Sequence, residues 1–599
     1  MLKTIQAGSL RSAHVNQVVT LAGWVDRRRD HGNLIFIDLR DSSGITQIVF
    51  DQILDPSVHQ SASLLRNEWV IQIIGKVRER PDGTINSELE TGQVEVIVSS
   101  LNILNESKTP PFYINKEEDS DELLRMKYRY LDLRKPKMQH IVNIRHQAVK
   151  FIRDFLTDQG FLEIETPILI KSTPEGARDY LVPSRLYPGK FYSLPQSPQQ
   201  LKQLLMSAGF EKYFQIARCF RDEDPRADRQ PEFTQLDLEM AFVESDDVLS
   251  LIEKLYYDLV KSITPNKNIK FPFPRIPYKQ AIEKYGTDKP DLRFGIEMST
   301  IVDWAEKTDI NILKSIISNN GTVKSLSAPG CGNYTRGEIS ELEELVKNSG
   351  GKGLMWIAIS EQAKSIEELT KEDIKSPVSK VLKINEIQEI ASILCCKPGD
   401  LILIVAGQEK VVNQSLSLIR DRLGTLLGLK DPNSFEFAFI TDFPLFEWKE
   451  EEKRWDAAHH PFTMPIKEHL DMISSDPSKV IAHCYDLVCN GLECGSGSIR
   501  IHSRELQEKV FGVLGYSKEE VASRFDQLLT AFEYGTPPHG GIATGIERLV
   551  MLLAGTDNIR DVVAFPKTQS FIDPLFDAPD HVSDEQLDEL HIKVKPIDT

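Results

Sequence analysis

An α+β protein of several domains is the fold class that the sequence predicts, and three observations support it. The chain has 599 residues, too many for one hydrophobic core and enough for about three or four domains of ordinary size. Short β-type runs occupy residues 18–98, and alternating strand patterns return after residue 430. Between them, helical patterns dominate residues 289–430, as expected of an inserted module.

Five β-type runs separated by turn signals predict a small barrel at the N-terminus. They are Val18–Val25, Leu34–Leu39, Ile45–Phe50, Trp69–Val77 and Val94–Val98, and Asp82-Gly83 is one of the turn signals. The commonest five-stranded barrel that binds oligonucleotides is the OB-fold, so we predict one in residues 1–105. The polar, acidic and proline-containing stretch after it predicts a linker over residues 106–136.

The remaining chain predicts one sheet domain that the inserted module divides. Its first part, residues 137–288, begins with an amphipathic helix that ends near Gly160 and continues with β-type runs and charged loops. Residues 289–430 combine helical patterns with the buried-strand run Leu401–Ala406, which indicates an inserted α/β module. The β pattern resumes in residues 431–599, which we expect to complete the sheet domain and add a C-terminal extension.

Composition limits the classes of function. The net charge of 71 − 89 = −18 argues against sequence-independent nucleic-acid binding driven by a global positive field, so any RNA contact must use local basic patches. No apolar run is long enough to span a bilayer and no signal peptide is evident, so we expect a cytoplasmic protein with no membrane partner. We interpret Cys484, Cys489 and Cys494 as buried thiols, with metal binding as the alternative.

One candidate site is a hairpin that ends in a strand with a polar face. Gln235, Asp237 and Glu239 alternate with apolar residues and share that face. Such a face is usually exposed to solvent. The loop before it, however, supplies the charge and donors that a nucleotide triphosphate needs, from Arg221, Glu223, Arg226, Arg229 and Gln230.

A second hairpin is predicted to turn on Asn490-Gly491, the strongest short hairpin signal. A two-residue turn pairs Val488 with Glu493 and Asp486 with Gly495. Asp486 and Glu493 would then be diagonal neighbours on one face, roughly 7 Å apart at the backbone. Their repulsion suits a Mg²⁺ ion held by carboxylates, phosphates and water. A solvated acidic pair explains the pattern equally well.

A third block, Gly540 to Arg548, predicts a glycine-rich turn that leads into an apolar helix. A helix N-terminus with Arg548 in its first turn suits a phosphate group. Most such turns only begin a helix, so this signal is weak by itself. Neither the P-loop motif nor the Rossmann glycine fingerprint is present, which argues against those nucleotide sites.

Together these blocks resemble the signature motifs of class II aminoacyl-tRNA synthetases. Gly160–Pro167 resembles motif 1, Phe220–Glu239 resembles motif 2 and Gly545–Arg548 resembles motif 3, whereas the class I signatures are absent. The chain is closer still to bacterial aspartyl-tRNA synthetases, over essentially its whole length. Three further blocks have the form familiar from that family: Thr173–Tyr180, Leu194–Gln199 and His459–Thr463.

The resemblance implies a fold and a reaction. The fold would be an anticodon-binding OB-fold, a class II antiparallel-sheet catalytic domain with a bacterial insertion, and a homodimer formed through motif 1. The enzyme would join L-aspartate to ATP, giving aspartyl-adenylate, and transfer the aspartyl group to the 3′ end of tRNA(Asp). Neither step requires a protein nucleophile, so catalysis would be positioning and charge stabilisation.

By the same resemblance, residues can be assigned to ATP and its metal. Arg221, Glu223 and Arg548 would be the catalytic residues, with Arg548 on the γ-phosphate. The full set implied for ATP is Arg221, Asp222, Glu223, Gln230, Glu493, Gly545, Ile546, Glu547 and Arg548. Asp486 and Glu493 would hold Mg²⁺.

Selection of aspartate follows from charge. Arg500 and Lys202 match the family positions that hold the side-chain carboxylate; a lysine-specific relative would need acids there, and an asparagine-specific one should not place two cations against a neutral amide. Asp237 would help to hold Lys202, while Glu175 and Gln199 would bind the ammonium group. The full implied set for aspartate is Glu175, Gln199, Lys202, Arg221, Gln235, Asp237, His459 and Arg500.

Recognition of tRNA is assigned to the barrel. Arg29, Phe36 and Gln47 would read the anticodon, with Phe36 stacked on a base, although Phe36 could equally be barrel core. His31 and Gly83 match members that charge both tRNA(Asp) and tRNA(Asn), which would require a partner amidotransferase. The alternatives are a strictly discriminating enzyme, a non-catalytic RNA-binding paralogue that should have lost Arg221, Glu493 or Arg548, and an amide ligase that should lack the barrel.

Overall fold

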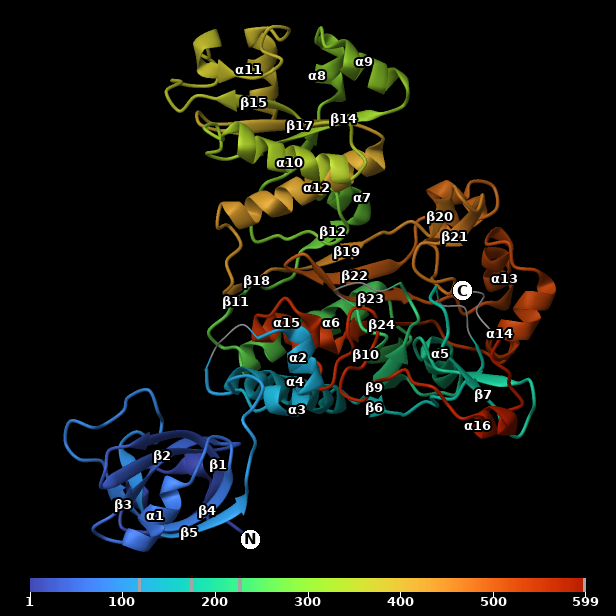
Figure 1. Ribbon diagram of the computed structural model, residues 1–599. Coiled ribbons are helices and arrows are strands. Elements are labelled where there is room, and N and C mark those ends of the chain that lie inside the picture. Colours follow the sequence, from blue (N-terminus) through green and yellow to red (C-terminus); the bar gives the residue numbers. More distant parts are fainter. Residues whose placement is uncertain (117–119, 173–175, 225–228, 596–599) are drawn as a thin grey trace. The chain divides into compact units, whose positions relative to one another are not determined.

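The computed structural model describes residues 1–116, 120–172, 176–224 and 229–595. They form two compact units (Figure 1). One unit comprises residues 1–143 and 560–581, and the other comprises residues 144–559 and 582–599. No helix among the described residues has the length and apolar character needed to cross a membrane.

The first unit contains the predicted barrel. Its strands close in the order β1-β2-β3-β5-β4, with a short helix α1 after β3. The bounds are β1 Val18–Asp30, β2 Leu34–Asp41, β3 Gly44–Asp51, α1 Pro56–Ser63, β4 Val70–Glu79 and β5 Val94–Asn105. Alternate residues such as Leu21, Ile37 and Ile73 fill a single apolar interior. The prediction of a five-stranded OB-type barrel is confirmed.

Two short helices occupy part of the stretch predicted as a linker, α2 Glu122–Lys127 and α3 Arg129–Asp132. Asp121 caps the first of them through the backbone N–H of Leu124. Arg125 and Arg129 both bond to the buried carboxylate of Asp132. This charged network, rather than an apolar pattern, orders the segment, which is why hydrophobic periodicity did not predict its helices.

The second unit is built on an eight-stranded sheet in the order β12-β19-β22-β23-β24-β10-β9-β6 (Figure 1). The bounds are β6 Leu162–Glu163, β9 Lys212–Phe220, β10 Glu232–Ala241, β12 Arg275–Pro277, β19 Phe437–Thr441, β22 Cys484–Cys489, β23 Leu492–Ile499 and β24 His539–Gly545. The central pairs are antiparallel, and only the edge strands β6 and β12 pair in parallel. The predicted antiparallel-sheet catalytic domain is confirmed.

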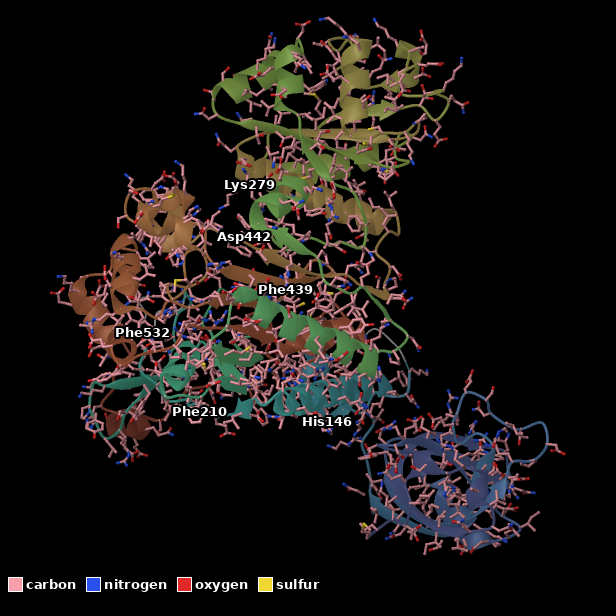
Figure 2. The ribbon with its side chains drawn as sticks, turned by 180° about the vertical axis from the view of Figure 1, so that it is seen from behind. His146, Phe210, Lys279, Phe439, Asp442 and Phe532 are labelled. Atoms are coloured by element: carbon pink, nitrogen blue, oxygen red, sulfur yellow. The ribbon has the colours of Figure 1, made fainter. Side chains whose placement is uncertain are left out.

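Helices and short hairpins surround this sheet. The helices are α4 Pro136–Asp158, α5 Gln199–Ser207, α6 Ser245–Ile263, α7 Tyr278–Tyr285, α13 Arg504–Val513, α14 Lys518–Phe532, α15 Ile546–Ala554 and α16 Asp584–Glu589. The additional strands are β7 Leu181–Pro183, β8 Phe191–Ser193, β11 Asn268–Ile269, β18 Ser434–Phe435, β20 Phe446–Lys449 and β21 Arg454–Ala457. Phe439 of β19, labelled in Figure 2, is fully buried and packs against Phe273.

The inserted module has helices on both faces of a five-stranded sheet, β13-β14-β17-β15-β16, whose pairs are all antiparallel. Its strands are β13 Met298–Thr300, β14 Thr322–Ala328, β15 Met355–Ile359, β16 Ile374–Lys375 and β17 Leu401–Gly407. Its helices are α8 Val302–Lys307, α9 Asn311–Ser318, α10 Arg336–Asn348, α11 Ile384–Ile393 and α12 Glu409–Leu426. Two separate apolar clusters fill the two faces, so the module has its own core.

The glycine-rich segment before Arg548 corrects one prediction, because it is the strand β24 and not a turn. A Cβ on Gly541 would lie 2.1 Å from the carbonyl oxygen of Leu238 in the neighbouring strand β10. The glycines therefore permit close approach of strands, which sequence alone does not distinguish from a turn. The apolar helix α15 follows as predicted and ends at Gly555 with a φ of 66°.

The β22–β23 register corrects a second prediction. Asn490 and Gly491 form the predicted turn with φ values of 51° and 87°, and Val488 pairs with Glu493. Asp486, however, pairs with Ser496 rather than Gly495, because a β-bulge inserts an extra residue into β23.

Candidate active site

Two cations and two carboxylates are buried together at the centre of the eight-stranded sheet. Lys202 of α5 lies 2.8 Å from Asp237 Oδ1 and 3.4 Å from Glu239 Oε2. Arg500, directly after β23, donates from Nε to Glu239 Oε1 at 2.9 Å and from Nη2 to Oε2 at 3.2 Å. We call these four residues the buried ion cluster.

The polar face of β10 is therefore not exposed to solvent. Asp237 and Glu239 are 0% exposed, and their pairing with Lys202 and Arg500 offsets the cost of burying them. Burial acts to raise the pKa of Glu239, but the positive charges of Arg500 and Lys202 outweigh it and lower that pKa. Gln235, on the same face, accepts a bond from the Cys219 thiol at 3.2 Å.

The buried ion cluster retains bonding capacity. Asp237 Oδ2 is buried and has no hydrogen-bond partner among the described residues. Arg500 Nη1 points away from Glu239, toward Ser498 Oγ at 2.6 Å and His460 Nε2 at 2.7 Å. Burial and the adjacent Arg500 charge hold the pKa of His460 well below its usual value, so His460 accepts a bond from Arg500 as a neutral ring.

Glu239 and His460 are site residues that the sequence-based set omitted. Glu239 belongs to the polar face recognised in the sequence, and its alternation with Asp237 was a usable signal. His460 follows His459, but only His460 contacts Arg500 in the structure. Neighbouring residues of an irregular segment point in different directions, and the sequence does not show which histidine faces which group.

A second cluster contains three arginines, two from the connection between β9 and β10 and one from α15. Arg221 lies over the Phe233 ring at 5.1 Å, and its buried Nε has no hydrogen-bond partner among the described residues. Arg548 Nη1 donates to the Glu493 carbonyl oxygen at 2.7 Å. Burial and the positive charges of Arg548 and Arg221 lower the pKa of Arg229, which also pairs with Glu223. Such mutual repulsion favours a bound polyanion.

Asp486 and Glu493 supply the acidic side of this region. Burial and the charge of Asp486 raise the pKa of Glu493, which indicates that the two carboxylates repel each other. Asp486 is 3% exposed, and its Oδ1 has no hydrogen-bond partner among the described residues. Asp486 is thus buried, whereas the Glu493 side chain is 37% exposed, and the oxygen donors of the pair fit a Mg²⁺ ion.

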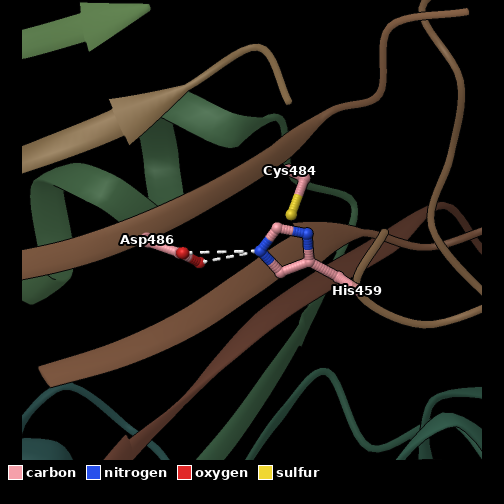
Figure 3. Close-up of side chains that lie close together, drawn as sticks. All are labelled: His459, Cys484 and Asp486. Atoms are coloured by element: carbon pink, nitrogen blue, oxygen red, sulfur yellow. Dashed lines mark hydrogen bonds and ion pairs between the residues drawn. The ribbon is translucent and has the colours of Figure 1, made fainter. Parts of the chain in front are cut away.

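His459 lies against Asp486 rather than against the buried ion cluster (Figure 3). Its Nε2 is 3.3 Å from Asp486 Oδ1 and 3.4 Å from Oδ2. Burial opposes protonation of the ring, but the neighbouring Cys484 sulfur and Asp486 carboxylate raise its pKa well above the usual value. Phe443 packs edge-on against the ring, with centroids 4.5 Å apart.

The remaining residues implied for ATP and aspartate have varied surroundings. Both carboxylate oxygens of Glu547 are engaged, with Arg145 at 3.0 Å and the Thr234 N–H at 3.0 Å. Gln199 donates to Gln203 at 3.1 Å. Asp222 forms an ion pair with Arg178. Gln230 and Ile546 are buried. Gly545 is the last residue of β24. Glu175 and Arg226 lie outside the described residues.

The barrel brings the implied anticodon residues onto adjacent strands. Arg29 of β1 donates to Asp38 at 2.7 Å and to Gln47 of β3 at 3.1 Å. Phe36 is half-buried and outside the apolar interior, and its ring meets His31 edge-on with centroids 5.7 Å apart. Gly83 has a φ of 79°, and a Cβ there would meet open space.

An antiparallel sheet that holds a buried ion cluster and an arginine cluster, in one chain with a five-stranded OB-type barrel, is the architecture of a class II aminoacyl-tRNA synthetase. The family model described as "tRNA synthetases class II (D, K and N)" matches residues 121–569, and the "OB-fold nucleic acid binding domain" model matches residues 19–104. The chain belongs to this class II D, K and N synthetase family.

Several relatives match over nearly the whole chain. "Aspartate--tRNA(Asp/Asn) ligase" of Dehalococcoides mccartyi strain CBDB1 is 53% identical, covering 99% of both chains. "Aspartate--tRNA ligase" of Clostridium tetani is 51% identical, covering 99% of this chain and 98% of the relative. The solved aspartyl-tRNA synthetase of Entamoeba histolytica has a TM-score of 0.58 at 22% identity, covering 94% of this chain and 91% of that one, and shows the shared fold.

Proposed function

We propose that the protein is an aspartate–tRNA ligase that uses ATP. The aspartate α-carboxylate attacks the α-phosphorus of ATP, which gives aspartyl-adenylate and releases diphosphate. The 3′-hydroxyl of the terminal adenosine of tRNA(Asp) then attacks the activated carbonyl and releases AMP. The relatives at about half identity carry this activity in their names, and the buried ion cluster is the structural observation that carries the proposal.

The buried ion cluster supports selection of aspartate. A side-chain carboxylate would approach the Arg500 guanidinium, in place of the bonds from Nη1 to Ser498 and His460, and the ammonium of Lys202. Glu239 and Asp237 hold these two cations in position. Two buried, pre-oriented cations favour a carboxylate over the neutral amide of asparagine, because the amide cannot offset their burial. Asp237 Oδ2 offers an acceptor for the substrate ammonium, a role that we also assign to Gln199 and Glu175.

The arginine cluster supports ATP binding. We propose that Arg221 bridges the substrate carboxylate and the α-phosphate, and that Arg548 binds the γ-phosphate. Glu223 and Gln230 would lie near adenine, and their loop carries Arg229. Asp486 and Glu493 would hold Mg²⁺, which when bound would neutralise charge on the leaving diphosphate. Pre-positioned charges stabilise the adenylyl group during its transfer to the aspartate carboxylate, without any protein nucleophile.

Exchange of diphosphate into ATP, measured with each of the twenty amino acids, tests this function. We expect aspartate-dependent exchange in the wild-type protein and a loss of roughly 10²-fold in Arg548→Gln, because a charge-assisted contact to phosphate is removed. Arg524→Gln, on α14, is the matched surface control. Exchange with lysine or asparagine and none with aspartate would refute the assignment.

We propose that tRNA(Asn) is a second substrate. The contact between His31 and the half-buried Phe36 supports this extension, since it places His31 beside an aromatic ring suited to stacking on an anticodon base. Strict selection of tRNA(Asp) is the second candidate, and the name of the Clostridium tetani relative favours it. Incubation with purified tRNA(Asn) decides between them: absence of aspartyl-tRNA(Asn) would leave only the strict enzyme.

Three further assignments belong to the same proposal. The enzyme would act in the cytoplasm as a homodimer through the motif 1 segment, where Leu162 and Ile168 are exposed. Aspartyl-tRNA(Asn) formed by a relaxed enzyme would need an amidotransferase to convert it to asparaginyl-tRNA(Asn). A non-catalytic paralogue is disfavoured because Arg221, Glu493 and Arg548 are all present.

A further inference from the structure

Three potential metal ligands of different chemistry meet beside the proposed Mg²⁺ site. His459, Cys484 and Asp486 each offer one ligand atom, and these atoms all lie within 4.8 Å of one another (Figure 3). Cys484 and Asp486 occupy one face of β22, and His459 reaches them from the segment after β21. Of the three cysteines considered in the sequence, only Cys484 joins a ligand group in the described part of the chain.

The ligand types select the metal. Mg²⁺ and Ca²⁺ take oxygen ligands, whereas a set of one thiolate, one imidazole and one carboxylate is typical of Zn²⁺. Three protein ligands would leave one of four tetrahedral positions open for water or substrate. We propose that His459, Cys484 and Asp486 form a zinc site that overlaps the proposed catalytic site.

The geometry is close to that of a coordinated ion. Nitrogen and oxygen ligands of one tetrahedral Zn²⁺ lie roughly 3.3 Å apart, given bond lengths near 2.0–2.1 Å. The observed distances from His459 Nε2 to the two Asp486 oxygens are 3.3 and 3.4 Å. Sulfur and nitrogen ligands would lie roughly 3.6 Å apart, and the ligand atoms of Cys484, His459 and Asp486 all lie within 4.8 Å of one another. Asp486 Oδ1, buried and without a hydrogen-bond partner among the described residues, gains one from the ion.

Zinc binding at this site inhibits the ligase. The ion displaces the thiol proton of Cys484 and the Nε2 proton of His459 to solvent. It thereby withdraws Asp486 from Mg²⁺ and fixes His459 away from substrate. The inhibition rests on the proposed function, whereas the binding does not.

Metal titration of the purified full chain tests the site independently of activity. Co²⁺ alone should produce a thiolate-to-cobalt charge-transfer band in the wild-type protein. The band should be lost in Cys484→Ala, with an affinity at least roughly tenfold lower. Cys494→Ala is the matched control, because Cys494 is a buried thiol in the same hairpin, outside the ligand group. An undiminished band in Cys484→Ala, or its loss in the control, overturns the site. The unfolding midpoints of Cys484→Ala and of the more conservative Cys484→Ser, compared with that of the wild type, exclude a folding defect as the cause of a lost band.

Zn²⁺ inhibition of aspartate-dependent exchange tests the consequence. We expect reversible inhibition of the wild-type protein and the Cys494→Ala control, relieved by a chelator, and at least roughly tenfold resistance in Cys484→Ala. Equal inhibition of all three proteins overturns the inhibitory role. Absence of exchange in every zinc-free protein supplied with Mg²⁺ refutes the proposed function instead, and the cobalt spectra still decide whether the zinc site exists.

Discussion

In the barrel, the guanidinium of Arg40 is buried against Asp26 and Glu68, much as Arg500 is buried against Glu239 in the eight-stranded sheet. Arg40 Nη2 bonds to both oxygens of Glu68 at 2.8 and 2.7 Å. No buried atom of these three barrel residues is without a partner among the described residues. The sheet cluster differs, because Asp237 Oδ2 has none.

This difference separates a structural ion network from one that can bind a ligand. Both require mutual pairing to offset the loss of hydration. In the barrel the pairing is closed, so the charges serve to fix strand positions. In the sheet the same chemistry leaves a carboxylate oxygen available and directs an arginine nitrogen toward a neutral histidine, His460. Incomplete internal pairing, rather than the presence of buried charge, distinguishes the proposed aspartate site from the structural network.

The largest effect should come from Arg500→Met. It leaves the buried Glu239 carboxylate with fewer partners and removes a proposed ligand of substrate. We expect a loss of about 3–5 kcal/mol in the free energy of unfolding and of roughly 10²–10³-fold in kcat/KM for aspartate. Urea unfolding and diphosphate exchange measure these effects.

The control for this change is Arg504→Met, because the ion pairs that Arg504 forms with Glu508 and Glu533 are exposed. It should alter stability by less than about 0.5 kcal/mol. Equal losses in the two variants would show that the burial of Arg500 has no special consequence.

Arg40→Met should affect stability alone. It leaves Asp26 and Glu68 buried without their shared cation, which should cost the barrel about 3–5 kcal/mol. Aspartate-dependent exchange should stay within about twofold of wild type, because the proposed activation step uses no barrel residue. Hydrogen exchange of the barrel amides, compared with those of the sheet, locates the loss of stability, and Lys76→Met on β4 provides an exposed control. If Arg40→Met lost as much diphosphate-exchange activity as Arg500→Met, the barrel network and the buried ion cluster would no longer be distinguished.

The smallest effect concerns pH. The pKa of Glu239 is lowered from its ordinary 4.5, so the unfolded chain binds this proton first, and stability is lost as pH falls through the folded value. Burial and the charge of Glu68 raise the pKa of Asp26 from its ordinary 3.8, although the charge of Arg40 opposes them. The contribution of Asp26 to stability is therefore present at low pH and is lost as pH rises through the pKa of the folded state.

Acidification from about pH 6 to about pH 4 should therefore weaken the sheet through Glu239 but not the barrel through Asp26. Hydrogen exchange resolved by region measures how the stability of the sheet and of the barrel changes with pH. Glu239→Gln should reduce the pH dependence of sheet stability, and Asp26→Asn should leave that dependence unchanged. An equal pH dependence of sheet stability in wild type and Glu239→Gln would contradict the role given to Glu239.

Much of the architecture was predictable because it depends on local patterns. The alternating runs 18–98 predicted the barrel strands, and Asn490-Gly491 predicted its hairpin turn. The errors arose where a residue type has two structural uses. Glycines serve equally in turns and in closely spaced strands, so the strand β24 was taken for a turn. A β-bulge depends on both strands of a pair, so the partner of Asp486 was misassigned.

The sequence by itself determined the fold class, the family and the residue types available for aspartate, ATP and RNA, because these follow from short-range patterns and motif spacing. Only the tertiary structure decided which charges are buried, which are already paired and which remain available to a ligand. Arg500, Glu239 and Lys202 are far apart along the chain, so their mutual pairing depends on strand order. His459 and Cys484 likewise meet only through folding, and burial converts that proximity into a potential metal site.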